Sequence, residues 1–330
     1  MNRQFNQETQ NDWRQTQNPV TIKHLADALK EKARALGFEA CGVARAGELK
    51  AVRPVFTEWL RQGYHGKMGY MGNHFEKRLD PRLLTPGARS VVVVAQNYYP
   101  SREQPPETTY RIARYAYGKD YHFLMKDRLK QLAAHLTDLS GEHQYRVFAD
   151  SAPVPERSWA REAGLGGTGK NTCLIIPRKG SFCFLGELIT SAELEPDKPF
   201  NKDLCGQCTR CMEACPTKAI IAPGKLDATR CISYLTIELK DAIPGAFRDQ
   251  CRGWIFGCDI CQEACPHNRH AKPHKEPVLD PLPPVSHWTD KEWASLSKKD
   301  FIKHFQKEGS PLARVKYEKL IDNIRCAATK

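Results

Sequence analysis

Cysteine spacing is the strongest chemical signal in the chain, because nine of its thirteen cysteines fall between residues 205 and 265. The first four spell the pattern C-x2-C-x2-C-x3-C-P: Cys205, Cys208, Cys211 and Cys215, with Pro216 behind them. In this pattern three thiolates from one tight loop bind three irons of a [4Fe–4S] cube, and the fourth thiolate reaches a second cube. The run therefore predicts two clusters and a second, reciprocal run of cysteines.

The second run is present but incomplete. Cys258, Cys261 and Cys265 give C-x2-C-x3-C-P, whereas Ile255 stands where the first cysteine of a full run would be. Another cysteine must therefore complete the ligands of the second cluster.

Two cysteines between the runs, Cys231 and Cys251, compete for that position. We favour Cys231, because its neighbours Ile232 and Tyr234 would shield a cluster from water. The charged stretch 248–252, which contains Cys251, is more typical of solvated surface. The reciprocal assignment gives one cluster Cys205, Cys208, Cys211 and Cys265, and the other Cys215, Cys231, Cys258 and Cys261.

Other uses of these cysteines fit the pattern less well. Structural zinc sites usually show two C-x2-C pairs rather than such a run, and a disulfide framework would require an oxidising compartment. Four cysteines outside the module are predicted to be ordinary thiols: Cys41, Cys173, Cys183 and Cys326. Because a pair of clusters conducts electrons without defining a reaction, a second reactive centre is expected in the rest of the chain.

Asp150 is the candidate for that chemistry, because it stands at the end of a predicted strand, where α/β folds place reactive groups. Packed against an apolar cofactor, its carboxyl group would have a raised pKa and could donate a proton near neutral pH. The alternative is structural, with Asp150 or Ser151 as the N-cap of a helix predicted over residues 156–163. Sequence alone does not separate the two.

A glycine-rich loop follows that helix. Residues 164–171 nearly match the phosphate-binding pattern G-x4-G-K-[ST], but Asn171 stands where Ser or Thr would hold magnesium. A helix-like segment precedes the loop and a strand-like segment, 173–176, follows it, which reverses the order found in NTPases. We therefore reject a nucleotide site and expect the glycines to let the backbone approach a large flat cofactor closely.

Hydrophobic periodicity predicts the elements that position these residues. Helices are expected over 22–36, 49–62, 123–139 and 156–163, and strands over 38–44, 90–98, 144–149 and 173–176. Four consecutive valines in the segment 90–98 indicate a strand buried on both faces. This alternation of helices and strands predicts an α/β (α+β) domain.

The distribution of residue types along the chain predicts four parts. They are a disordered tail (1–19), the α/β domain (20–194), a ferredoxin-like di-[4Fe–4S] domain (195–272), and a proline-rich linker with a small all-α (HEAT-like) region (273–330). Three C-terminal helices are expected at about 290–296, 298–306 and 311–327, with Ser297 and Ser310 as N-caps and Pro311 at the first helical position.

The net charge of +12 favours an anionic partner such as nucleic acid, although a merely soluble basic protein fits the charge equally well. No stretch reaches the roughly 18 uncharged apolar residues of a membrane span. The N-terminus shows neither a secretory nor a twin-arginine signal. These features predict a cytoplasmic protein, expected to be a monomer, that does not contact membranes.

From about Thr21 to Ala327 the chain also resembles the epoxyqueuosine reductases, cobalamin-dependent iron–sulfur enzymes of queuosine-tRNA synthesis. Long motifs carry this resemblance: Tyr117-Gly-Lys-Asp-Tyr-His122, Asp150-Ser-Ala-Pro-Val-Pro-Glu-Arg157, Gly164-Leu-Gly166, Gly169-Lys-Asn-Thr172, Gly180-Ser-Phe182, Cys231-Ile-Ser-Tyr-Leu-Thr-Ile-Glu238 and Gly257-Cys-Asp-Ile-Cys-Gln262.

The resemblance implies a corrinoid in the α/β domain beside the cluster module, with its lower axial ligand absent. The clusters would reduce cob(II)alamin to a cob(I)alamin-like state, which opens the epoxide of epoxyqueuosine at the tRNA wobble position, and the oxygen leaves as water. Asp150 matches the family's proton donor. The residues implied to bind cobalamin are Asp150, Tyr117, Asp120, Tyr121, His122, Trp159, Gly167, Thr168, Gly169, Lys170, Asn171 and Ser233. The implied partners are tRNA bearing epoxyqueuosine and an electron donor such as a flavodoxin or ferredoxin system.

Two further features bear on the resemblance. The family usually has bulky residues where this chain has Gly167-Thr168, a change expected to widen the pocket. Basic residues near the C-terminus suit contacts with tRNA phosphates, or equally a solvated helix face: Lys298, Lys299, Lys303, Lys307, Arg314, Lys316 and Lys319.

Three other functions compete with this interpretation. A reductive dehalogenase pairs a corrinoid with similar clusters, but generally carries a twin-arginine leader, which is not seen here. A ferredoxin-type electron carrier would have no substrate of its own and would not bind cobalamin. An RNA-binding protein with purely structural clusters would bind tRNA regardless of the clusters' redox state.

Overall fold

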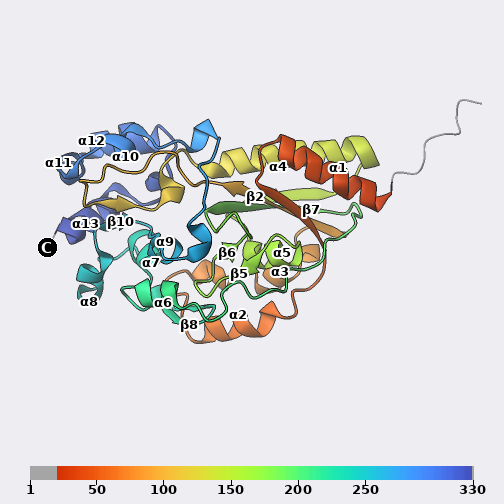
Figure 1. Ribbon diagram of the computed structural model, residues 1–330, viewed down its shortest axis with the longest axis horizontal. Helices are drawn as coiled ribbons and strands as arrows, with labels where there is room; N and C mark the ends of the chain where they lie inside the picture. Colours follow the sequence, from red (N-terminus) through yellow and green to blue (C-terminus); the bar gives the residue numbers. More distant parts are fainter. Residues whose placement is uncertain (1–20, 329–330) are drawn as a thin grey trace, which may run out of the picture.

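The computed structural model describes residues 21–328, and a four-stranded sheet forms the centre of its N-terminal part (Figure 1). The strands are antiparallel throughout, in the order β1 (Ala40–Arg45), β2 (Ser90–Asn97), β7 (Cys183–Thr190) and β4 (Tyr145–Phe148). The fold is therefore mixed α/β, and the pairing corresponds to the α+β form of that prediction. The expected disordered tail lies outside the described residues.

Strand β2 is buried on both faces, which is what its valine run predicts. Val92 and Val94 point into one hydrophobic cluster, while Val91 and Val93 point into another on the opposite face. The strand thus joins the two cores of the sheet.

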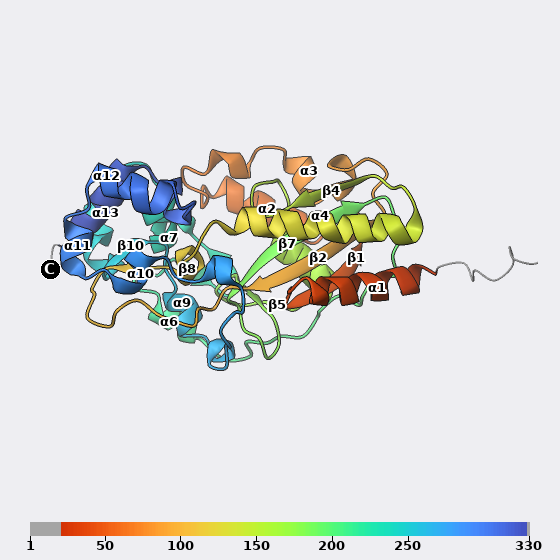
Figure 2. The same ribbon diagram turned by 90° about the horizontal axis from the view of Figure 1, so that it is seen from above.

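Two long helices, α1 (Ile22–Ala35) and α4 (Tyr121–Ser140), lie side by side across one face of the sheet (Figure 2). Gly186 of β7 allows α4 to approach closely, because a Cβ there would lie 2.9 Å from Cε of Met125 and 3.0 Å from Cδ1 of Leu129. Strand β7 is not predicted from the sequence, because Gly186 and Glu187 interrupt its apolar run.

The opposite face of the sheet is covered by α5 (Glu156–Glu162), which buries Trp159 and Ala160. After α5 the chain forms a short hairpin, β5 (Gly167–Thr168) and β6 (Leu174–Ile175). This order of helix and then strands around the glycine-rich loop agrees with the rejection of a nucleotide-binding loop. Two further helices of this part are α2 (Val52–Arg61) and α3 (Phe75–Leu79).

The cysteine-rich module consists of short elements. They are α6 (Arg210–Ala214), β8 (Ile220–Ala222), β9 (Lys225–Leu226), α7 (Ile232–Ile237), α8 (Gly245–Arg248), β10 (Trp254–Phe256) and α9 (Ile260–Glu263). Strand β10 pairs in parallel with β3 (Arg111–Ile112), which lies outside the predicted limits of the module. A segment from the N-terminal part of the chain therefore completes it.

Four short α-helices follow at the end of the molecule away from α1 (Figures 1 and 2). They are α10 (Pro283–His287), α11 (Asp290–Ala294), α12 (Lys298–Phe301) and α13 (Tyr317–Ala328). Ser297 caps α12, as expected, and a π-helical turn over Ile302–Gln306 continues it.

Two predictions for this region are wrong. The single helix expected over 311–327 is divided, because Pro311–Arg314 form a 3-10 turn capped by Ser310, and Val315 is extended and buried before α13 begins. The segment 273–284 is not a free linker either. Leu279 packs into the same cluster as α1 and α4, and α10 begins within the segment. No helix among residues 21–328 is long and apolar enough to cross a membrane.

The packing of α4 on the sheet leads to a stability prediction. Leu129→Ala should lower the free energy of unfolding by about 2–5 kcal/mol, because Leu129 is fully buried and its loss leaves a cavity. Phe123→Ala on the same helix is the control, since Phe123 is 79% exposed and should change that free energy by less than about 0.5 kcal/mol. Denaturant unfolding followed by far-UV circular dichroism measures both, and equal losses would contradict this packing.

Candidate functional site: two cysteine quartets and an acidic wall

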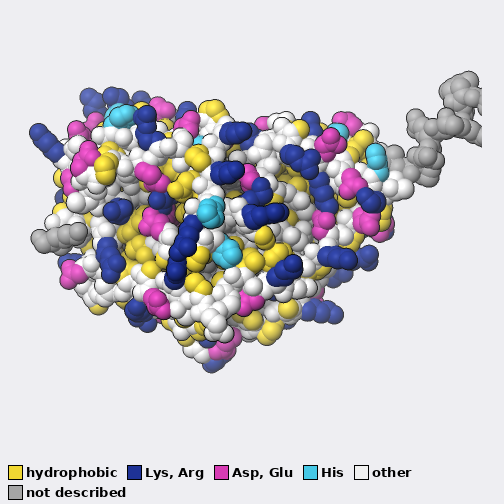
Figure 3. Space-filling view, in the orientation of Figure 1, with side chains coloured by type: hydrophobic (Ala, Val, Ile, Leu, Met, Phe, Trp, Pro, Cys, Tyr) yellow, Lys and Arg dark blue, Asp and Glu magenta, His cyan; other side chains and the backbone are white. Residues whose placement is uncertain are grey.

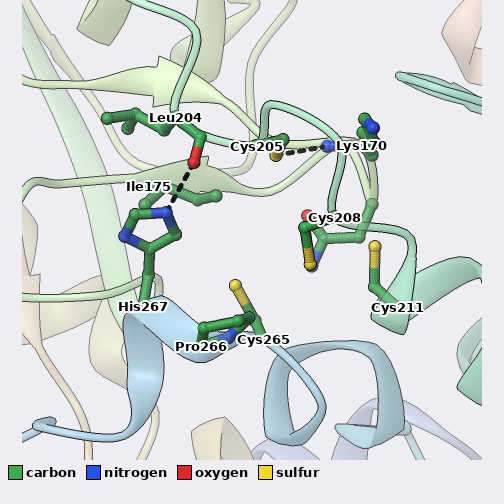
Figure 4. Close-up of a pocket in the computed structure, with 10 residues that line it drawn as sticks. Lys170, Ile175, Leu204, Cys205, Cys208, Cys211, Cys265, Pro266 and His267 are labelled. Carbon is green, nitrogen blue, oxygen red and sulfur yellow. Dashed lines mark hydrogen bonds between the residues drawn. The ribbon is translucent and has the colours of Figure 1, made fainter.

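The first cavity, of about 170 Å³, is lined by four cysteines from both runs (Figure 4). Cys205, Cys208 and Cys211 come from the loop before α6 and its first turn, and Cys265 comes from the end of the second run. Their sulfur atoms face the same space in Figure 4. This is the grouping that the spacing predicts for the first cluster.

The wall of this cavity also supplies a backbone donor. The Lys170 amide lies 3.4 Å from Sγ of Cys205, while Lys170 Nζ donates to the carbonyl oxygen of Gly206 at 2.7 Å. Amide donors to sulfur stabilise negative charge on an iron–sulfur cluster and tune its reduction potential. The glycine-rich loop therefore contacts the first cluster site directly.

The second cavity, of about 250 Å³, is lined by the other predicted quartet: Cys215, Cys231, Cys258 and Cys261. Burial raises the pKa of the Cys231 thiol, so bound iron rather than solvent would favour its thiolate. Cys251 lines neither cavity. It is 1% exposed within an apolar cluster, so the solvated surroundings expected for it are wrong.

Cys173 is a residue whose position sequence reasoning missed. The chain spacing isolates it, yet it lines the second cavity and hydrogen bonds to Cys261, which lowers the pKa of the Cys173 thiol. Its place beside the GKNT motif is the signal that could have indicated it.

Asp150 lies two residues beyond β4 and adopts a left-handed backbone conformation with φ of 55°. Its amide donates to Oε1 of Glu156 at 2.5 Å, which holds this strained conformation in place. The N-cap position of α5 belongs to Pro155, so neither Asp150 nor Ser151 caps that helix. The structural alternative for Asp150 is therefore wrong.

The Asp150 carboxylate faces two cationic side chains. Its Oδ2 lies 3.4 Å from Nε2 of His122 and 3.5 Å from an Nη of Arg314. His122 is held from its other side by Asp120, whose Oδ1 is 2.5 Å from Nδ1 of the imidazole. Arg314 is held by Glu238 at 2.7 Å.

These contacts determine whether Asp150 or His122 carries the proton. The hydrogen bond with His122 lowers the pKa of Asp150, whereas the rise expected from sequence is for a carboxyl packed against a bound cofactor and stays a prediction. Hydrogen bonds to Asp120 and Asp150 raise the pKa of His122 to about 9. The pair therefore holds its proton mainly on the imidazole at neutral pH.

Tyr115 connects this group to the cluster site. Its side chain lines the second cavity, and its phenol lies close enough to Arg314 and Asp150 for their charges to influence its pKa, which burial raises. Tyr115 therefore links the surroundings of Asp150 to the wall of the second cavity.

The remaining predicted residues divide into two groups. Lys170, Asn171 and Ser233 line the two cavities, and Tyr121 hydrogen bonds to Asp150. Tyr117 and Trp159 lie away from the site, because each is buried in an apolar cluster and lines neither cavity.

The surroundings of Gly167 and Gly169 explain why glycine stands at these two positions. A Cβ on Gly167 would lie 3.3 Å from the Phe200 ring, so that ring occupies the space where a bulkier residue would begin. Gly167 lines neither of the two cavities, so the widening expected at this point stays a prediction. A Cβ on Gly169 would meet Oδ1 of Asn171 at 2.7 Å. Thr168 is exposed.

Two cysteine quartets beside a mixed α/β domain define an iron–sulfur protein of the double-cluster class. Residues 204–268 match the model of a 4Fe-4S double cluster binding domain, and residues 78–151 match that of "Epoxyqueuosine reductase QueG, DUF1730".

Curated relatives extend the match to nearly the whole chain. It is 48% identical to the epoxyqueuosine reductase of Cyclobacterium marinum, over 92% of this chain and 97% of that protein. It is 40% identical to the one from Pseudomonas aeruginosa, over 93% and 86% of the two chains. The chain belongs to the epoxyqueuosine reductase family.

Solved structures agree with this assignment. An epoxyqueuosine reductase crystallised with an epoxyqueuosine-modified tRNA-Tyr stem loop is 32% identical, with a TM-score of 0.85 over 93% of this chain and 81% of that one. The Bacillus subtilis enzyme, solved with its catalytic loop swung out of the active site, is 32% identical, with a TM-score of 0.83 over 93% and 82%.

The choice between the two candidate ligands can be tested by iron content. Cys231→Ala should reduce bound iron from about eight atoms per chain to about four, because one of two four-iron clusters loses a ligand. Cys251→Ala is the matched control and should keep about eight, because Cys251 lies outside both cavities. Iron and sulfide analysis of anaerobically purified protein gives the answer, and the reverse pattern would exclude Cys231 as the ligand.

The His122 contacts predict a pH-dependent contribution to stability. Because the pKa of His122 is raised to about 9 in the folded protein, the contribution is complete below the unfolded value near 6.5 and disappears as pH rises through 9. The difference in free energy of unfolding between the wild type and His122→Gln should therefore shrink from pH 6 to pH 10. Denaturant titrations across that range measure it, and a constant difference would contradict the assigned contacts.

Proposed function

We propose that this chain reduces epoxyqueuosine to queuosine in tRNA, with electrons that pass through its two clusters to a reacting centre beside Asp150. The observation that carries the proposal is the position of Tyr115, which lines the cavity of the second cysteine quartet and lies within electrostatic reach of the Asp150 carboxylate. Membership of the epoxyqueuosine reductase family supports the substrate. Removal of the epoxide oxygen as water requires two electrons and two protons, so a reducing site and a proton source must lie together.

The order of the clusters follows from exposure. The loop that carries the first quartet is open to solvent at Gly206, Gln207 and Thr209, so an external donor such as a flavodoxin or ferredoxin can reach it. The second quartet lines a cavity together with Tyr115, whose phenol is within electrostatic reach of Asp150. We infer that electrons enter through the first cluster and leave through the second.

The wall of the second cavity carries polar groups suited to a corrinoid. The cavity extends beyond the four thiols, and Arg157, Thr172 and Ser233 line its walls with guanidinium and hydroxyl groups that can bind the amide side chains of such a ring. Arg157 is held against Thr172 by a 2.7 Å bond to the carbonyl oxygen of that residue. When bound there, cobalamin would supply a strongly reducing metal centre between the second cluster and the substrate.

Proton transfer belongs to the Asp150–His122 pair. Asp120 fixes the imidazole through Nδ1 and leaves Nε2 directed at Asp150. A proton stored on His122 can thus reach the substrate oxygen through the Asp150 carboxyl, while Arg314 keeps that carboxyl in place.

tRNA is the proposed partner, and five of the seven C-terminal basic residues are exposed for contact with its phosphates: Lys298, Lys299, Lys303, Lys307 and Lys316. The other two are already engaged. Arg314 is paired with Asp150 and Glu238, and Lys319 is buried with Nζ donating to the Asp241 carbonyl oxygen at 2.8 Å. Figure 3 shows further lysines and arginines spread over the visible face. The exposed C-terminal lysines and the net charge of +12 would both attract tRNA.

The function can be tested with anaerobically purified protein supplied with cobalamin, reductant and a tRNA that contains epoxyqueuosine. Wild-type protein should convert the nucleoside to queuosine, detected by mass spectrometry. Asp150→Asn should lower the rate at least about 100-fold, because the variant cannot transfer a proton. Asp138→Asn, an exposed position on α4, is the control and should keep the rate.

Two outcomes would change the assignment. Cobalamin binding without conversion would leave a corrinoid reductase with another substrate. Absence of cobalamin binding, with both clusters intact, would favour the electron carrier.

A further inference from the structure

Behind Asp150, on the face of the sheet covered by α5, lie two acidic side chains that the proposed mechanism does not use. Glu187 is fully buried on β7, opposite Val93 of β2 and Phe148 of β4. Neither of its carboxyl oxygens has a hydrogen-bond partner within the described residues. A charged carboxylate in such a place would be very costly, so Glu187 is neutral, and burial raises its pKa accordingly.

Glu156 lies between this interior and the reacting group. It begins α5, and its Oε1 accepts the Asp150 amide at 2.5 Å. When neutral, the side chain can accept that bond on its carbonyl oxygen while its other oxygen carries a proton. Burial and the nearby Asp150 charge raise the pKa of Glu156 to about 8.

Charged and titratable groups from several elements surround Glu156. Asp150 follows β4, Glu187 lies on β7, His122 and Tyr121 lie on α4, and Arg157 is the next residue on α5. Arg157 and His122 favour the ionised form of Glu156, whereas burial and Asp150 oppose it, and the opposing effects are larger.

The reaction requires a second proton, which Glu156 can supply. Both C–O bonds of the epoxide break, two electrons enter from the clusters, and the oxygen must gain two protons to leave as water. The Asp150–His122 pair holds one proton. A second must arrive before the oxygen can depart.

We propose that Glu156 supplies this second proton through Asp150, so that one carboxyl group delivers both. After Asp150 and His122 have given the first proton to the oxygen, the neutral Glu156 transfers its own to the Asp150 carboxylate, which passes it on. Glu156 ends as a carboxylate and regains a proton from solvent between turnovers. It acts through Asp150 and does not touch the substrate. The role rests on the proposed epoxide reduction, but the stored proton itself does not.

Infrared difference spectroscopy of the cluster-loaded protein between pH 7 and pH 9 tests the stored proton without any turnover. Wild-type protein should show loss of a neutral carboxyl C=O band near pH 8, and Glu156→Gln should lack this band. Glu187→Gln is the spectroscopic control and should keep it. No titrating band, or a band that survives in Glu156→Gln, would overturn the proposal.

Single-turnover conversion of the modified stem loop tests the transfer. Glu156→Gln should slow conversion about 100-fold at pH 7 and remove the decline in rate near pH 8, with tRNA affinity unchanged. Glu162→Gln, on the same helix but paired with Arg161, should behave like the wild type. Wild-type rates in Glu156→Gln would refute the role. If the wild type converts nothing while the infrared band is present, the proposed function fails and the stored proton stands.

Discussion

The structure depends on the crossing of two cysteine runs. Cys265, from the second run, lines the cavity of the first, and Cys215, from the first run, lines the cavity of the second. Each cluster therefore links segments about fifty residues apart in sequence, and metal binding adds to the small apolar cluster that these short elements build. Strand β10 of the cysteine-rich module pairs with β3 and so joins the module to the N-terminal part of the chain.

This arrangement explains why the reacting group can lie so close to the second cluster. The segment just after β3 brings Tyr115 to the wall of the second cavity, and the end of β4 brings Asp150 to the same region. Arg314, from the C-terminal region, completes the group by pairing with Asp150. Residues from three distant parts of the chain thus converge on one carboxylate, whose ionisation is controlled by its partners rather than by burial alone.

Sequence reasoning predicted the composition of the two quartets because ligand spacing is local chemistry, and the same pattern left only one position open. It also predicted β2, since a run of valines is typical of a strand with no solvent-exposed face. It failed where the reason for a residue lies in distant packing. Cys251 has charged neighbours but is buried by elements remote in sequence, and β7 contains Gly186 because α4 presses against it.

By itself the sequence determined which residues can bind two clusters and that Asp150 is a candidate for acid chemistry, because residue type and short spacing are sufficient for both conclusions. The tertiary structure decided that Asp150 faces His122 and Arg314, that Cys173 joins the second cavity, and that the half-buried Glu156 and the buried Glu187 lie behind Asp150. Those relations join segments far apart along the chain. Periodicity and motif spacing describe only near neighbours, so only the folded structure could reveal them.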